Sequence, residues 1–161
     1  MMRRNERGFS LVEVVVALGL LAGVLIAIAG LFIIGGKQVK SGRTSSEAIA
    51  LAKEIHEEMN AWGYTQLWDM FGYNGQASTY TIDTRTNGAC TAWQTTLRQK
   101  LGNSAYANIK LDSVTNAAGA TSNFADAGGN ILAKTVRVSV TVNWTEVPGR
   151  PRSVTVGTTK N

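Results

Sequence analysis

The sequence predicts an α+β protein in which a long N-terminal hydrophobic helix packs on a small antiparallel β-sheet. Two observations lead to this fold class. Residues 9–34 form an apolar run that continues into an amphipathic helical pattern, and residues 135–144 alternate between apolar and polar side chains. A chain of 161 residues has room for one anchor helix and one domain of about 100 residues.

The apolar run of residues 9–34 is long enough to cross a membrane, because about 20 apolar residues span a bilayer core. A secretory signal has a shorter apolar core, closely followed by a small-residue cleavage site that is not found here. Basic residues flank the run equally, with Arg3, Arg4 and Arg7 before it and Lys37, Lys40 and Arg43 after it. The positive-inside rule therefore does not decide the orientation.

Glu13 carries the single formal charge within residues 9–34. Insertion scales assign an acidic residue at the centre of a membrane helix roughly +2.5 to +3.5 kcal/mol. An ionisable group in such a segment is therefore a functional candidate. The alternative is a stray glutamate in an ordinary anchor.

A short basic leader precedes the octet Gly8-Phe9-Ser10-Leu11-Val12-Glu13-Val14-Val15. This arrangement closely resembles the cleavage and assembly signature of the type IV prepilin family. The resemblance implies that residues 1–8 are a leader that a peptidase removes by cutting between Gly8 and Phe9. It also implies that the new amine of Phe9 is N-methylated and pairs with Glu13 of a neighbouring subunit.

The same resemblance implies where the protein resides and what it meets. We expect a single pass through the bacterial inner membrane with a cytoplasmic N-terminus, followed by a place in a periplasm-spanning or cell-surface filament. The implied partners are the prepilin peptidase/methyltransferase, the inner-membrane assembly platform, the lipid bilayer before assembly, and other pilins or minor pilins that bind through the N-terminal helix.

Residues 37–62 are predicted to be the amphipathic half of the helix that begins with the membrane segment, residues 9–36. Apolar residues recur there at steps of three and four: Ala48, Leu51, Ala52, Ile55, Met59 and Trp62. Gly63 follows as a plausible stop. Several glycines interrupt the first half, of which Gly19 and Gly23 form a GxxxG pair that either allows close helix contact or reflects common membrane composition. The Gly35-Gly36 pair predicts a flexible exit from the bilayer.

Residues 63–161 are predicted to form the globular domain with a C-terminal antiparallel sheet. We expect strands at residues 79–83, 109–114, 135–144 and 153–157, a helix at 91–101 and a loop at 115–130. Residues 63–78 are predicted to form a structured loop that can include a helical turn. The strand at 135–144 has the clearest alternation, and Pro148-Gly149 predicts the turn to its partner. The apolar face of the sheet should cover the stripe at residues 51–62.

Catalytic signatures are lacking, so we expect no enzyme, cofactor or resident metal. His56 is the single histidine, and Cys90, the single cysteine, cannot form an internal disulfide and is expected to be a buried apolar residue. Many pilins close a C-terminal loop with a disulfide, and this chain departs from that pattern. Whether the loop that holds Asn116, Asn123, Asp126 and Asn130 binds calcium stays open, since it offers one carboxylate.

Three functions fit the sequence. Residues 47–59 and the Val-x-Val-x-Val-x-Trp run resemble V-type minor pilins and I-type pseudopilins. The favoured function is a minor pilin subunit of a type IV pilus that acts in initiation or at the tip. The alternatives are a minor pseudopilin of a type II secretion system and a single-span anchored binding protein that does not polymerise.

Overall fold

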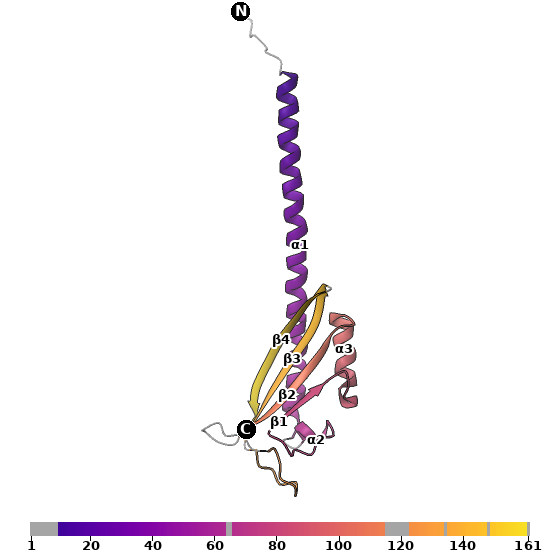
Figure 1. The fold of residues 1–161 in the computed structure, drawn as a ribbon, viewed down its shortest axis with the longest axis vertical. Coiled ribbons are helices and arrows are strands. Elements are labelled where there is room, and N and C mark those ends of the chain that lie inside the picture. The colour runs from indigo at the N-terminus through magenta and orange to yellow at the C-terminus, as the bar shows by residue number, and fades with distance from the viewer. Residues whose placement is uncertain (1–9, 64–65, 115–122, 134, 148, 161) are drawn as a thin grey trace, which may run out of the picture. The chain divides into compact units, whose positions relative to one another are not determined.

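The computed structural model describes residues 10–63, 66–114, 123–133, 135–147 and 149–160. Its elements follow one another as α1 (Leu11–Ala61), α2 (Gln66–Asp69), β1 (Thr79–Asp83), the 3-10 turn η1 (Gly88–Cys90), α3 (Thr91–Leu101), β2 (Tyr106–Val114), β3 (Thr135–Val147) and β4 (Arg150–Lys160) (Figure 1). The chain divides into two compact units, Met1–Gly42 and Arg43–Asn161. Helix α1 contributes to both, and the sheet belongs to the second.

Helix α1 is one unbroken helix of 51 residues. It continues through Gly35 and Gly36, where the sequence predicted a flexible exit from the bilayer. Each glycine weakens a helix by about 1 kcal/mol relative to alanine, but the leucine, lysine and glutamine residues on either side, Leu31, Lys37 and Gln38, favour helix. Scattered glycines therefore do not end α1, which stops at Ala61, two residues before Gly63.

The four strands form an antiparallel sheet in the order β1-β2-β3-β4, so each strand pairs with its neighbour in sequence. Ile82, Ile109, Val140 and Val156 share one row across the sheet. All four predicted strands are present, and three are longer than predicted. Strand β2 begins at Tyr106, β3 extends to Val147, and β4 covers Arg150–Lys160. Pro148 of the predicted turn lies outside the described residues, and Gly149 adopts a φ of 83°, which favours glycine.

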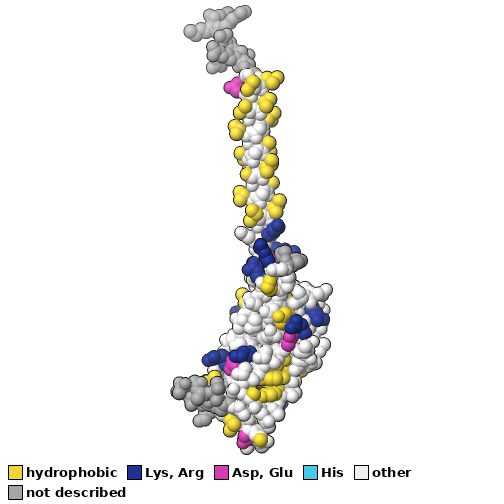
Figure 2. Space-filling model, in the orientation of Figure 1, with side chains coloured by type: hydrophobic (Ala, Val, Ile, Leu, Met, Phe, Trp, Pro, Cys, Tyr) yellow, Lys and Arg dark blue, Asp and Glu magenta, His cyan; other side chains and the backbone are white. Residues whose placement is uncertain are grey.

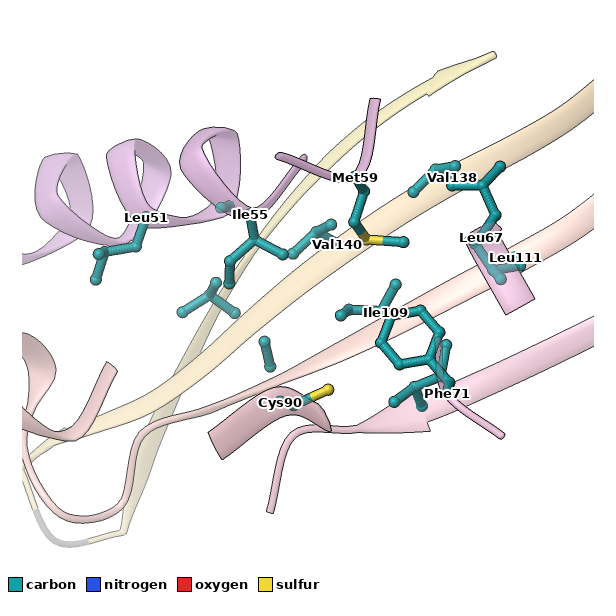
Figure 3. Close-up of a cluster of buried hydrophobic side chains, with 14 of the residues drawn as sticks. Leu51, Ile55, Met59, Leu67, Phe71, Cys90, Ile109, Leu111, Val138 and Val140 are labelled. Atoms are coloured by element: carbon teal, nitrogen blue, oxygen red, sulfur yellow. The ribbon is translucent and has the colours of Figure 1, made fainter. Parts of the chain in front are cut away.

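The core of the second unit lies between α1 and one face of the sheet. Five stripe residues of α1 are buried as predicted: Ala48, Leu51, Ala52, Ile55 and Met59. In Figure 3, Ile55 and Met59 point from α1 toward the strands that carry Val140 and Ile109. The opposite face of β3 carries polar residues such as Arg137 and Thr141, which are not buried. The predicted fold class is therefore confirmed.

Aromatic contacts extend this core around the end of α1. Trp62 stacks on Trp93 of α3 with 5.7 Å between ring centroids. The indole nitrogen of Trp93 donates a hydrogen bond of 2.7 Å to the carboxylate of Glu58. Trp68, in the short helix α2, stacks on Phe124 with 5.2 Å between centroids. Helix α2 is the helical turn for which the sequence of residues 63–78 left room.

The C-terminal end of α1 is held by a residue far along the chain. The ammonium group of Lys160 in β4 donates hydrogen bonds to the carbonyl oxygens of Asn60, at 2.8 Å, and of Trp62. The last carbonyls of a helix lack partners within the helix, and a cation there also meets the negative end of the helix dipole. Strand β4 therefore fixes the end of α1 as well as the edge of the sheet.

Candidate functional site

Of the three predicted site residues, the structure describes Glu13, which belongs to the first unit. Gly8 and Phe9, between which the cleavage is predicted, lie outside the described residues. Glu13 lies in the first turn of α1 and is exposed to solvent. The structure thus places the carboxylate, while the cleavage and methylation of Phe9 stay predictions.

The carboxylate of Glu13 has a partner within its own turn. The backbone N–H of Ser10 donates a hydrogen bond of 3.3 Å to Glu13 Oε2, and the N–H of Val14 donates one of 3.2 Å to the carbonyl of Ser10. This is half of a capping box, in which the residue three places after a serine cap accepts from the backbone of the cap. The spacing Ser10-Leu11-Val12-Glu13 before an apolar run carries this signal. Our sequence reasoning missed it.

The capping bond leaves Glu13 able to bind a second group. An ionised carboxylate offers about four lone-pair sites, and the Ser10 N–H uses one of them. A negative charge in the first helical turn is also favourable, since it faces the positive end of the helix dipole. Glu13 can therefore stabilise the start of its own helix and still accept hydrogen bonds from a cationic amine.

The rest of the first half of α1 presents apolar side chains on every side. Leu11, Ile26 and Phe32 are 80%, 74% and 77% exposed, and Figure 2 shows apolar side chains along this part of the helix. By length and composition, α1 is able to cross a membrane. Apolar surface of this extent in a soluble protein marks a site of contact with lipid or protein.

Gly19 and Gly23 lie on one side of α1, because four residues advance a helix by slightly more than one turn. A Cβ atom added at either position would meet no atom within 4 Å in the described chain. No contact with the described residues therefore requires these glycines. Both interpretations of the GxxxG pair, close helix contact and common composition, stay open.

The remaining residues singled out in the sequence lie in the second unit. Cys90 is fully buried, as predicted, and burial raises the pKa of its thiol to about 11, with the nearby charge of Asp83 adding to the shift. Figure 3 shows its side chain among the buried residues. A thiol in this environment stays protonated and is a poor nucleophile. His56 is half-buried, and its Nε2 has no hydrogen-bond partner among the described residues.

The loop considered for calcium forms hydrogen bonds within itself. One oxygen of Asp126 accepts from the backbone N–H of Gly128 at 2.9 Å and of Asn130 at 2.8 Å, and the other accepts from the amide of Asn130 at 2.7 Å. These bonds, led by the one from the Asn130 side chain, hold the pKa of Asp126 below its usual range. Asn123 is exposed, and Asn116 lies outside the described residues. In the described ranges, no three His, Cys, Asp or Glu residues gather as a metal site.

Comparison with known proteins identifies the N-terminal segment. Residues 3–35 match a family model described as the prokaryotic N-terminal methylation motif. The match includes the octet with Gly8, Phe9 and Glu13 and the whole of the apolar run. No curated protein and no solved structure matches the chain.

Proposed function

Since the chain carries the N-terminal signal of type IV prepilin-like proteins, we propose that it is a minor pilin subunit of a type IV pilus that acts in pilus initiation or at the tip. The motif supports a type IV pilin-like or pseudopilin protein, processed by a prepilin peptidase and assembled with other pilins. The signal and the apolar helix are also consistent with an inner-membrane anchor.

The observation that carries the proposal is the position of Glu13 in the matched motif. Cleavage after Gly8 frees the amine of Phe9 four residues before this carboxylate, and methylation keeps the amine basic. A charged amine and a carboxylate are each costly in an apolar environment, and they offset this cost when two subunits bring them together. The acceptor sites that the Ser10 bond leaves on Glu13 make such pairing possible.

Two features favour a minor subunit over a disulfide-looped major one. The chain has one cysteine, Cys90, which is buried. Residues 47–59 resemble the corresponding helix of V-type minor pilins. I-type pseudopilins share this helix, so a minor pseudopilin of a type II secretion system is the second candidate. Deleting the gene should abolish pili in the first case and secretion in the second. In both roles the protein acts by assembly, and we propose no enzymatic activity.

Mass spectrometry of the membrane-extracted protein tests the processing step. The mature chain should begin at Phe9 with one added methyl group. Gly8→Val should block cleavage, because a β-branched side chain replaces the glycine at the cleavage site. Gly19→Val is the matched control, since an added Cβ meets no atom within 4 Å there, and it should be processed normally. An intact leader in assembled protein would refute the proposal.

Two substitutions of Glu13 separate pairing from helix capping. Glu13→Gln keeps an acceptor for the Ser10 N–H but removes the charge, whereas Glu13→Val removes both. If pairing with the Phe9 amine is the main role, both variants should insert in the membrane and both should be depleted from sheared filaments. If Glu13→Gln assembles as well as the wild type while Glu13→Val does not, capping explains the residue and the pairing role is wrong.

A further inference from the structure

The second unit contains a polar cavity of about 260 Å³ beside the turn that connects β1 to α3. Its nine lining residues are threonine, arginine, asparagine, glutamine and glycine, and none of them is apolar or acidic. The volume is below the roughly 300–1,000 Å³ that is usual for drug-sized ligands. The cavity therefore suits one small polar group.

The floor of the cavity is held by hydrogen bonds to β2 and to Ala105, the residue just before it. The hydroxyl of Thr84 donates to Gln94 Oε1 at 2.5 Å and accepts from the backbone N–H of Ala107 at 2.9 Å. The amide of Gln94 donates to the carbonyl of Ala105 at 2.8 Å. Thr84 and Gln94 are both buried. Their side chains are thus fixed before any ligand arrives, which lowers the entropy lost on binding.

The threonine hydroxyl groups at the rim already donate their hydrogen bonds to backbone carbonyls. Thr91 donates to the carbonyl of Gly88 at 2.7 Å, Thr95 donates to the carbonyl of Thr91 at 2.8 Å, and Thr86 donates to the carbonyl of Asp83 at 3.2 Å. A hydroxyl oxygen that has donated its proton keeps acceptor lone pairs. These threonines therefore favour a ligand that carries its own hydroxyl donors.

Two guanidinium groups, those of Arg85 and Arg98, add hydrogen-bond donors and positive charge to the lining. Nε and Nη2 of Arg85 hold the carboxylate of Asp83 at distances from 2.6 to 3.1 Å, and the guanidinium lies 3.8 Å from the centroid of the Tyr106 ring. Arg85 is thereby fixed in place, and its Nη1 donates no hydrogen bond to the described residues, which leaves it able to bind a ligand. Arg98 adds a second positive charge to the lining, which contains no acidic residue. The cavity thus has one positive charge that Asp83 does not offset.

We propose that this cavity binds a hydroxylated small molecule that carries one carboxylate, the chemistry of an acidic sugar unit. The carboxylate would lie between Arg98 and Nη1 of Arg85, because a guanidinium binds planar oxyanions with two parallel hydrogen bonds. The sugar hydroxyls would donate to the threonine oxygens. This inference uses the globular unit alone and does not depend on the processing or assembly of the chain.

Calorimetric titration of the full chain in detergent micelles tests the proposal. Glucuronate should bind with a Kd on the order of 1 mM, as expected for a small and partly open site. Glucose, which lacks the carboxylate, should bind at least about tenfold more weakly, and inorganic phosphate, which lacks the ring hydroxyls, should as well; each tenfold change corresponds to about 1.4 kcal/mol. Binding of phosphate without binding of glucuronate would overturn the proposal.

Two variants with equal changes in charge assign the binding to the cavity. Arg98→Gln removes the exposed guanidinium and should weaken glucuronate binding at least about tenfold. Lys100→Gln lies two residues away in α3, outside the lining, and should leave the affinity unchanged. Equal losses in the two variants, or equal affinities for glucose and glucuronate, would show non-specific attraction and refute the site. Unchanged melting temperatures verify that both variants fold.

Discussion

The two halves of α1 contain similar apolar residues in opposite surroundings. Between residues 11 and 34 the large apolar side chains are exposed, whereas those of the second-half stripe, Leu51, Ile55 and Met59, are at most 8% exposed. The first half is apolar around its whole circumference, and the second half has one apolar stripe. A helix with one apolar stripe can thus bury it within the same chain, whereas a helix that is apolar all round needs lipid or another molecule to cover it.

This difference determines where each half contributes free energy. Burying a large apolar side chain contributes roughly 1.5–3 kcal/mol. The stripe of the second half has already made this contribution to the fold. The side chains of the first half can make it only in a bilayer or against other subunits, so substitutions there should change insertion and assembly while leaving the globular unit intact.

The largest effect should come from truncating the same residue type in the two halves. Ile55→Ala should lower the free energy of unfolding of the globular unit by about 2–5 kcal/mol, because it leaves a cavity at a residue that is 3% exposed. Ile26→Ala should leave it unchanged, because Ile26 is 74% exposed. Tryptophan fluorescence in urea is a suitable measurement, since all four tryptophans lie in the second unit.

Either of two results would break the comparison. Equal unfolding midpoints for Ile55→Ala and the wild type would show that the buried face of α1 is wrongly assigned. A loss of several kcal/mol for Ile26→Ala would show that the first half also stabilises the globular unit. The exposed substitution Glu57→Ala provides a second control in the same turn of the helix as Ile55.

A smaller effect should appear in the reactivity of Cys90, which reports how tightly the second unit is closed. Its pKa is raised from 9.0 to about 11, so at pH 8 its thiolate fraction should be about one hundredth of that in the unfolded chain. Alkylation of the folded protein should be slower by at least this factor, and should accelerate as the pH approaches 11. Equal rates in buffer and in urea would contradict the closed core.

The smallest of these effects concerns the end of α1. Lys160→Met keeps the apolar stem of the side chain but removes the ammonium group that donates to the carbonyls of Asn60 and Trp62. We expect the unfolding free energy to fall by about 1–2 kcal/mol. Lys53→Met, an exposed change on α1, should alter it by less than about 0.5 kcal/mol. Equal effects would show that the two hydrogen bonds do not stabilise the fold.

The fold could be predicted because its strongest signals are local. The alternation in β3 and the stripe in α1 each identify a buried face within a few residues, and strands that pair with their sequence neighbours need no further information. The predicted ends of the strands were less accurate than the predicted strands themselves. Residues 106–108 lack the β-branched pattern and are held in β2 by pairing with β3, as in the pair Ala107 and Val142.

The candidate site was predictable only in part. A lone carboxylate in an apolar run identified Glu13, and the motif match confirms the signal that surrounds it. The sequence did not reveal the cavity near Arg98, because its lining combines α3 with the turn that follows β1, and these are brought together by folding. The bond from Lys160 to Asn60 joins residues 100 positions apart, a distance over which no periodic pattern acts.

The bond between Lys160 and Asn60 also means that the end of α1 can be held only late in the synthesis of the chain. A ribosome adds about 5–20 residues per second, so the end of α1 must wait roughly 5–20 s for the strand that holds it. Strand β3, which covers the stripe, also emerges well after the helix. Until β3 has been made, Leu51, Ile55 and Met59 lack their cover, and the nascent chain exposes an apolar helix face to which chaperones can bind and through which it can aggregate. The protein should therefore be most vulnerable during its own synthesis.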